Sequence, residues 1–124
     1  MAIQSYRDLD VWQQAMRLVE AVYAATGSFP SSELYGLTSQ TRRCAVNIPS
    51  NIAEGRGRKG TREFINFLAI AYGSLCELQT HLELAHRLRF LDKVVHDRLQ
   101  IQTDEVGRML NGLMNSLGRR NSTP

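Results

Sequence analysis

The amino-acid sequence predicts an all-α protein, an antiparallel up-down-up-down four-helix bundle. Apolar residues recur at intervals of three and four along four long stretches, and short connections separate those stretches. No stretch shows the sustained alternation of apolar and polar residues that a half-buried β-strand requires. The chain has 124 residues, so we expect one domain at residues 1–118 and a flexible tail at 119–124.

The first two helices follow from the spacing of the apolar residues. The first runs from Asp8, a candidate N-cap, to Ala25, and its expected buried face is Trp12, Met16, Val19 and Tyr23. The second begins near Ser31 or Ser32, and its apolar face is Leu34, Leu37, Thr41, Cys44, Ile48 and Ile52. Pro49 lies inside this second stretch, where it removes a backbone hydrogen bond, so we expect the helix to be kinked there.

The third helix is expected to start at Thr61 as N-cap, and the fourth spans about Asp92 to Leu117. The seam of the third helix is the most regular, and it consists of Phe64, Leu68, Ala71, Leu75, Leu78, Leu82 and Ala85. The seam of the fourth is Val95, Leu99, Val106, Met109 and Leu113, and the polar Gln102 interrupts it.

The third helix carries more apolar residues than one buried stripe needs. Ten of the 13 residues from Phe64 to Cys76 are apolar, which covers most of the helix circumference. This segment is too short to span a bilayer, which takes roughly 20 residues. We therefore expect the surplus side chains Ile65, Ile70 and Tyr72 to form a subunit interface in a homo-oligomer.

Positive charge is concentrated in one segment. Residues 42–62 hold six basic residues and one acidic residue, whereas the remainder of the chain is slightly acidic. Such a local basic region favours a polyanionic partner, RNA or DNA. The candidate phosphate contacts are Arg56, Arg58, Lys59 and Arg62 at the hairpin tip, with Arg42 and Arg43 as a separate patch about 20 Å back along the second helix. Arg42 and Arg43 are equally suited to inter-subunit salt bridges, and no aromatic residue interleaves with the basic ones, which argues against base stacking.

The glycines of the basic tip do not form a nucleotide-binding loop. Gly55 to Gly60 match G-x-G-x-x-G, but a helix rather than a strand precedes them, and the Gly-Lys-Ser/Thr of a P-loop is absent. We interpret the stretch as a glycine-terminated helix followed by a flexible turn whose backbone a partner can approach closely.

No catalytic or metal centre is expected. Cys44 and Cys76 fall inside helices, where buried free thiols in a reducing cytoplasm are the natural interpretation. Glu83 and His86 have the Glu-x-x-His spacing of di-metal bundles, but the second such pair is missing, so a metal-dependent enzyme is a remote alternative. Glu77 and His81 share a face and are interpreted as a solvated ion pair. We predict no cofactor and no membrane association, and the N-terminal residues lack the features of a signal peptide.

Several motifs together resemble one known family. They are Leu9-Asp-Val-Trp12, Phe29-Pro30, Tyr35-Gly-Leu-Thr-Ser-Gln40, Arg43, Ile48-Pro-Ser-Asn-Ile-Ala-Glu-Gly55, Glu63-Phe64, Phe67-Leu68 and Gly73-Ser-Leu-Cys-Glu77. The pattern resembles the bacterial four-helix-bundle family encoded in intervening sequences of large-subunit ribosomal RNA genes, which is related to the accessory variability protein of diversity-generating retroelements. It covers residues 6 to about 91, and the fourth helix matches only in character.

The resemblance implies a homopentamer of four-helix bundles without catalytic activity. In the retroelement branch the pentamer binds nucleic acid through a basic surface and associates with a reverse transcriptase. Many relatives carry an arginine where this chain has Tyr72, so one positive charge is absent here. The favoured interpretation is a non-enzymatic, oligomeric accessory scaffold that binds RNA or DNA. The alternative is a protein-interaction module whose basic tips bind an acidic protein partner.

Overall fold

The computed structural model describes residues 5–122, and all of its regular structure is helical, which confirms the predicted fold class. Four long helices carry the fold, and shorter turns precede α1 and α2. In chain order the elements are η1 Tyr6–Asp8, α1 Asp10–Thr26, η2 Ser31–Glu33, η3 Leu34–Thr38, α2 Ser39–Gly57, α3 Thr61–Arg87 and α4 Lys93–Ser122.

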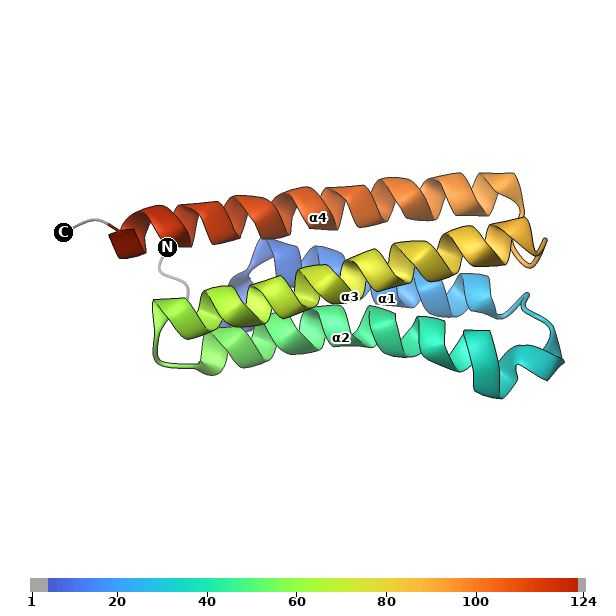
Figure 1. Ribbon diagram of the computed structural model, residues 1–124, viewed down its shortest axis with the longest axis horizontal. Helices are drawn as coiled ribbons and strands as arrows, with labels where there is room; N and C mark the ends of the chain where they lie inside the picture. Colours follow the sequence, from blue (N-terminus) through green and yellow to red (C-terminus); the bar gives the residue numbers. More distant parts are fainter. Residues whose placement is uncertain (1–4, 123–124) are drawn as a thin grey trace.

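The four helices lie side by side along one axis, and successive helices run in opposite directions (Figure 1). The start of α1, the α2–α3 connection and the end of α4 lie at one end of the bundle (Figure 1). The α1–α2 and α3–α4 connections lie at the other end. Contacts between α1 and α2, α2 and α3, α3 and α4, and α4 and α1 close the bundle around one core. The antiparallel up-down-up-down arrangement is therefore confirmed.

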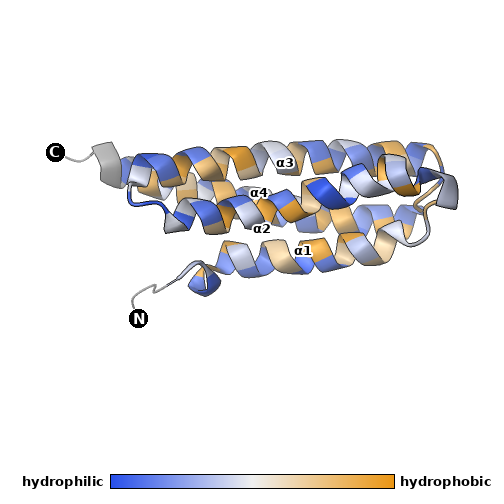
Figure 2. Cartoon of the chain, turned by 90° about the horizontal axis from the view of Figure 1, so that it is seen from below, coloured by the Kyte–Doolittle hydropathy of each residue, from blue (hydrophilic) through white to orange (hydrophobic). Residues whose placement is uncertain are grey.

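The seam predicted for α3 is correct. Leu68, Ala71, Leu75, Leu78, Leu82 and Ala85 are all buried, and Phe64 packs against the core from its edge. Hydrophobic positions alternate with hydrophilic ones along each helix, as an amphipathic bundle requires (Figure 2). The start of α3 differs by one residue, because Gly60 is its N-cap and Thr61 is already helical.

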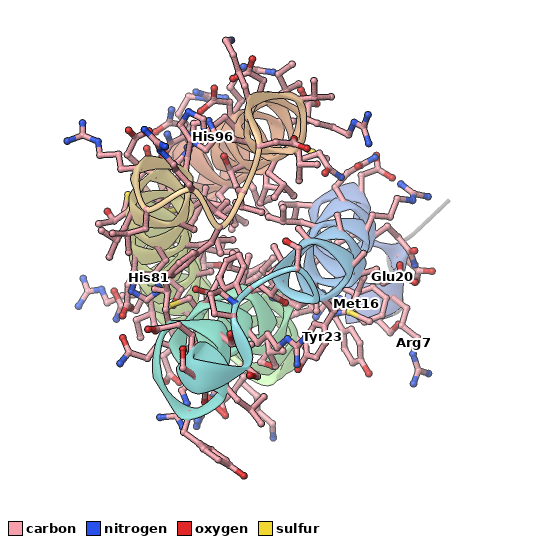
Figure 3. The ribbon with its side chains drawn as sticks, turned by 90° about the vertical axis from the view of Figure 1, so that its right-hand side faces the viewer. Arg7, Met16, Glu20, Tyr23, His81 and His96 are labelled. Atoms are coloured by element: carbon pink, nitrogen blue, oxygen red, sulfur yellow. The ribbon has the colours of Figure 1, made fainter. Side chains whose placement is uncertain are left out.

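The buried face of α1 is one residue out of register with the predicted one. Its core positions are Val11, Ala15, Leu18, Val22 and Thr26. The predicted Met16 and Tyr23 are 38% and 45% exposed and point away from the bundle (Figure 3), while Trp12 and Val19 are half-buried at the edge. Asp8 caps no long helix. It belongs to η1, where its side chain and that of Ser5 form a reciprocal capping box.

The approach to α2 is irregular. The chain passes through a short 3₁₀ turn and a π-helical turn, and Gly36 leaves helical backbone geometry with φ −110° and ψ −113°. Because the backbone at Gly36 is not helical, Leu34 does not share a helix face with the residues after it, and it is 47% exposed. The face from Leu37 to Ile52 is buried as predicted. Pro49 is buried inside α2, which continues as one helix across it, so a kink at Pro49 stays a prediction.

The seam predicted for α4 is correct at Leu99 and Val106, whereas Val95, Met109 and Leu113 are half-buried at the edge of the core. Thr103 rather than Gln102 fills the gap in the buried face, which continues through Leu110 and Leu117. Thr103 is fully buried, donates its hydroxyl to the Gln100 carbonyl (2.9 Å) and accepts from Nε2 of Gln79 (3.0 Å). Asp92 caps the helix by accepting from the Val95 amide. The helix continues to Ser122, so the predicted end at Leu117 is wrong and part of the expected tail, residues 119–122, is helical.

Candidate nucleic-acid interface

An open groove of about 870 Å³ lies where the α2–α3 connection meets η1 and the last turns of α4. It is at the end of the bundle where α1 begins and α4 ends (Figure 1). We call it the basic groove. Its lining comprises Ser5, Tyr6, Leu9, Arg56, Gly57, Arg58, Lys59, Gly60, Thr61, Phe64, Leu113, Ser116 and Leu117.

The basic groove has a strongly positive lining. It brings together Arg56, Arg58 and Lys59, three of the six cationic residues singled out from the sequence, and no carboxylate belongs to its described lining. Arg62 is exposed in the first turn of α3, beside the groove but outside its lining. The α2–α3 connection that carries these residues is hydrophilic (Figure 2). The site can therefore attract anions from solvent.

The four cationic side chains of this region differ in their exposure and in their interactions with the rest of the chain. The Arg58 guanidinium pairs with Glu54 at 3.7 Å, with both side chains about half exposed, and lies 5.0 Å from the ring centroid of Phe67. An exposed pair of this kind contributes roughly 0–1 kcal/mol, so a phosphate can replace Glu54 at little cost. Arg56 is half-buried and has interactions within the chain. Lys59 and Arg62 are exposed and form no ion pair with any described residue.

The glycines of the connection leave the backbone open. A β-carbon on Gly57 or Gly60 would meet no atom within 4 Å, so neither glycine is required for packing. The predicted glycine-terminated helix is confirmed, because α2 ends on Gly57, with Arg58 as an extended C-cap. No described glycine adopts positive φ, so this helix end does not use a left-handed glycine. Gly60 precedes α3 without any side-chain cap on that helix. The N-terminal end of α3, with its partial positive charge, therefore opens beside the basic groove.

Two aromatic side chains accompany the cations, contrary to the sequence expectation. Tyr6 from η1 and Phe64 from α3 both line the basic groove. Tyr6 also packs edge-on against Trp12, with 5.1 Å between ring centroids. The linear sequence hides this arrangement because Tyr6 is far from the basic residues along the chain. The signal that could have found it is the Ser5-x-x-Asp8 capping box, which fixes the turn that carries Tyr6.

Arg42 and Arg43 lie in a different place. They line a smaller hollow of about 460 Å³ near the start of α2, together with Tyr23, Leu34, Tyr35, Thr38, Ser39, Val46 and Asn47. Arg42 Nε donates to Oγ1 of Thr26 at 2.8 Å, and its guanidinium lies 4.7 Å from the ring centroid of Tyr23. Arg42 therefore links α2 to α1, while Arg43 is exposed.

Of the three residues predicted to form a subunit interface, two are partly buried within their own chain and one is exposed. Ile65 and Tyr72 are partly buried and pack against the core of their own chain. Ile70 is 53% exposed. Apolar surface is also exposed elsewhere, at Leu34 and Tyr35 in the smaller hollow. The additional apolar residues of α3 are therefore partly buried within the bundle itself.

Glu83 and His86 are engaged with other groups. Glu83 accepts a hydrogen bond from Arg87 (2.8 Å), which lowers the pKa of its carboxyl, and it lies 3.3 Å from Nε2 of His96. His86 stacks on His96, with 4.4 Å between ring centroids, and its Nδ1 lies 3.1 Å from the Leu91 carbonyl oxygen. Of the two cysteines, Cys44 is buried as predicted, whereas Cys76 is exposed.

Comparison with known proteins identifies the family. The sequence pattern of the 23S rRNA-intervening sequence protein family matches residues 7–112, which includes α1, α2, α3 and most of α4. A search among curated proteins found no match. Within the described part of the chain, no helix combines the length and apolar character needed to cross a membrane. The family match spans most of the bundle, and the chain therefore belongs to the 23S rRNA-intervening sequence protein family.

Proposed function

We propose that this protein is an accessory scaffold that binds RNA or DNA through the basic groove. The observation that carries the proposal is the lining of that groove, which holds Arg56, Arg58 and Lys59 and no described carboxylate. Phosphate contacts of this kind release condensed counterions and supply most of the affinity in sequence-independent binding. The family's description names a ribosomal RNA intervening sequence and no enzymatic activity, which supports a non-catalytic role.

The form of the groove favours a single strand over a duplex. Tyr6 and Phe64 supply aromatic surface for unpaired bases, while Arg58 and Lys59 supply charge for the phosphates. Cationic grooves with aromatic side chains are the usual arrangement for single strands, because every base has a face that can stack. The bare backbone at Gly57 and Gly60 lets the strand approach without side-chain obstruction.

Salt dependence of binding is the first test. Labelled single-stranded RNA, single-stranded DNA and the corresponding duplexes would be titrated with protein and followed by fluorescence anisotropy. We expect single strands to bind more tightly, and the logarithm of the association constant to fall linearly with the logarithm of salt concentration. With three or four phosphate contacts the slope is about −2 to −3. A salt-independent affinity would contradict the proposal.

Charge reversal locates the binding site. The variant R56E/R58E/K59E/R62E is expected to lose binding while keeping its helical content by circular dichroism. The matched control is R87E/R89E/K93E/R98E, which makes the same change in net charge with exposed residues at the far end of α3 and the start of α4. Equal loss in both variants would show that only total charge matters, and retained binding in the first would exclude the groove.

Pull-down before and after nuclease treatment separates RNA or DNA from an acidic protein partner. We expect bound material to disappear after nuclease digestion. Protein that stays bound through the Arg58 and Lys59 surface after digestion would favour the interaction-module alternative instead.

Self-association is a second part of the proposal. The family resemblance implies a pentamer, which would set several basic grooves on one assembly and raise the total affinity for a long strand. The exposed Ile70 and the exposed Leu34 and Tyr35 offer apolar surface for contacts between copies. Solution mass from light scattering should exceed that of one chain, and I70S or L34S/Y35S should reduce it. A wild-type protein that stays monomeric at high concentration would refute this part.

A further inference from the structure

Cys44, Glu77 and His81 form a cluster of three metal-ligating side chains between α2 and α3. Sγ of Cys44 lies 3.7 Å from Nδ1 of His81, and Oε2 of Glu77 lies 4.0 Å from Nε2 of His81. One ligand atom from each of the three residues lies within 4.8 Å of the others. His81 projects from α3 beside α2 (Figure 3), and Cys44 comes from the facing side of α2.

Secondary structure positions the three groups. Glu77 and His81 are four residues apart on α3, so they share one face of the helix. Cys44 belongs to the buried face of α2, the helix packed against α3, and its side chain is only 4% exposed. The site thus combines a rigid buried sulfur, a half-buried imidazole and an exposed carboxylate that is free to adjust.

The spacing fits a small tetrahedral ion. Zinc binds sulfur at about 2.3 Å and imidazole nitrogen at about 2.0 Å, which places sulfur and nitrogen ligands about 3.5 Å apart in a tetrahedron. The observed distance of 3.7 Å from Sγ of Cys44 to Nδ1 of His81 is close to this value. The Glu77 side chain is 61% exposed, so its carboxylate can reach the same ion by rotation about its own bonds.

We propose that Cys44, His81 and Glu77 bind one divalent transition-metal ion of the zinc class, with water as the fourth ligand. A thiolate, an imidazole and a carboxylate are the ligand types that zinc and cobalt accept, whereas calcium and magnesium prefer oxygen ligands alone. The ion joins α2 to α3 and stabilises the folded chain, by an amount that grows with the logarithm of the free ion concentration once that concentration exceeds the dissociation constant.

A cysteine–histidine nucleophile is the competing interpretation of the same residues, and the surroundings of Cys44 argue against it. A catalytic cysteine needs an accessible thiolate. Here burial, reinforced by the nearby Glu77 carboxylate, raises the pKa of the Cys44 thiol to about 12. A metal ion can displace that proton on binding, but a substrate has little access to a sulfur that is 4% exposed.

Neither ligand spacing nor composition reveals this cluster in the sequence. From the sequence, Glu77 and His81 are interpreted as a surface ion pair, and Cys44 is one of two isolated cysteines. The cluster forms because α2 and α3 pack in one register, which brings together residues 37 positions apart. The cluster lies on helix faces outside the lining of the basic groove, so a test of metal binding does not depend on nucleic-acid binding.

Cobalt(II) titration of the purified full chain, stripped of metal with a chelator, tests the proposal. We expect one Co²⁺ per chain, a thiolate-to-cobalt charge-transfer band in the near ultraviolet, and intense visible bands that mark tetrahedral geometry. Added Zn²⁺ should abolish these bands by displacement. It should also raise the thermal unfolding temperature of the wild-type chain.

Three variants assign the ligands. C44S should remove the charge-transfer band, H81Q should weaken Zn²⁺ binding at least about 100-fold, and E77Q at least about 10-fold. The matched controls C76S and H86Q change the other cysteine and a histidine elsewhere on α3, and both should bind as the wild type does.

The proposal is overturned if wild-type protein shows no charge-transfer band, or if C44S and H81Q bind Zn²⁺ with unchanged affinity. Loss of binding in C76S or H86Q with retention in C44S would likewise overturn it, because the ion would then sit elsewhere. Circular dichroism confirms that each variant is folded. If C44S or H81Q fails to fold, the wild-type spectrum and E77Q, which alters an exposed residue, still decide the question.

Discussion

A β-carbon added to Gly55 would lie 2.5 Å from Cβ of Phe67, so α2 and α3 approach each other too closely here for any side chain but hydrogen. The same carbon would meet Cδ1 of Phe64 at 3.1 Å. Phe67 Cβ is fixed to the backbone of α3, which means that rotation of its side chain cannot relieve the contact. Gly55 therefore sets the distance between the two helices beside the basic groove.

Replacement of Gly55 by alanine should destabilise the protein by about 1–3 kcal/mol, the usual cost of overpacking a core. Gly57→Ala is the matched control, because a β-carbon there meets nothing within 4 Å and alanine is the better helix former. We expect the control to be neutral or stabilising by up to about 1 kcal/mol. Urea denaturation of both variants measures the difference, and equal stability would contradict the close approach.

The amphipathic pattern was sufficient to predict the bundle but not the orientation of every helix. In α3 the spacing of the apolar residues defines one buried face without ambiguity, and the prediction is correct from Leu68 to Ala85. In α1 two neighbouring stripes are apolar, and the prediction favours the stripe with the larger residues, although the bundle buries the stripe that contains the small Ala15. The choice depends on how closely α1 approaches its neighbours, which spacing along one helix does not encode.

The candidate site was predicted from charge but not in its shape. Arg58 and Lys59 lie where the basic segment indicated, while the groove around them exists because Tyr6 and Leu117 arrive from opposite ends of the sequence. Only the charge of Arg42 is visible in the sequence, which is why the sequence offers it both as a nucleic-acid contact and as a partner in inter-subunit salt bridges. Its engagement with Thr26 depends on the packing of α1 against α2.

Arg42 should matter for stability and its neighbour Arg43 should not. Arg42→Ala removes a charged hydrogen bond to the buried Thr26 and a cation–π contact with Tyr23, so we expect a loss of about 2 kcal/mol in the free energy of unfolding. Arg43→Ala changes an exposed residue and should stay within about 0.5 kcal/mol of the wild type. Urea denaturation provides both values. Similar effects of the two substitutions would mean that Arg42 acts only through its charge.

Arg89 follows the end of α3 with a φ of 67°, the left-handed conformation that favours glycine. This conformation lets the Phe90 amide donate to the Ala85 carbonyl at 2.8 Å and so closes the helix end. Arg89→Gly should stabilise the chain by about 0.5–1 kcal/mol, since the gain from removing Cβ exceeds the added entropy of the unfolded chain. Arg89→Ala is the control for loss of charge, and we expect it to show no such gain. Thermal unfolding distinguishes the two.

The reactivity of Cys44 should depend on pH in a way that reports its buried environment. Burial and the nearby Glu77 carboxylate raise the pKa of the Cys44 thiol from 9.0 to about 12, so the folded chain holds that proton after the unfolded chain has lost it. This contribution to stability is complete below pH 9 and is lost as pH rises toward 12. Because only the thiolate is alkylated, iodoacetamide should modify folded Cys44 very slowly at pH 8, and its rate should rise about tenfold per pH unit up to the pKa. Mass spectrometry of a C76S variant in chelator measures this rate, and the same variant unfolded in urea supplies the reference. Cys44 that reacts equally fast in folded and unfolded chains would contradict its burial against α3.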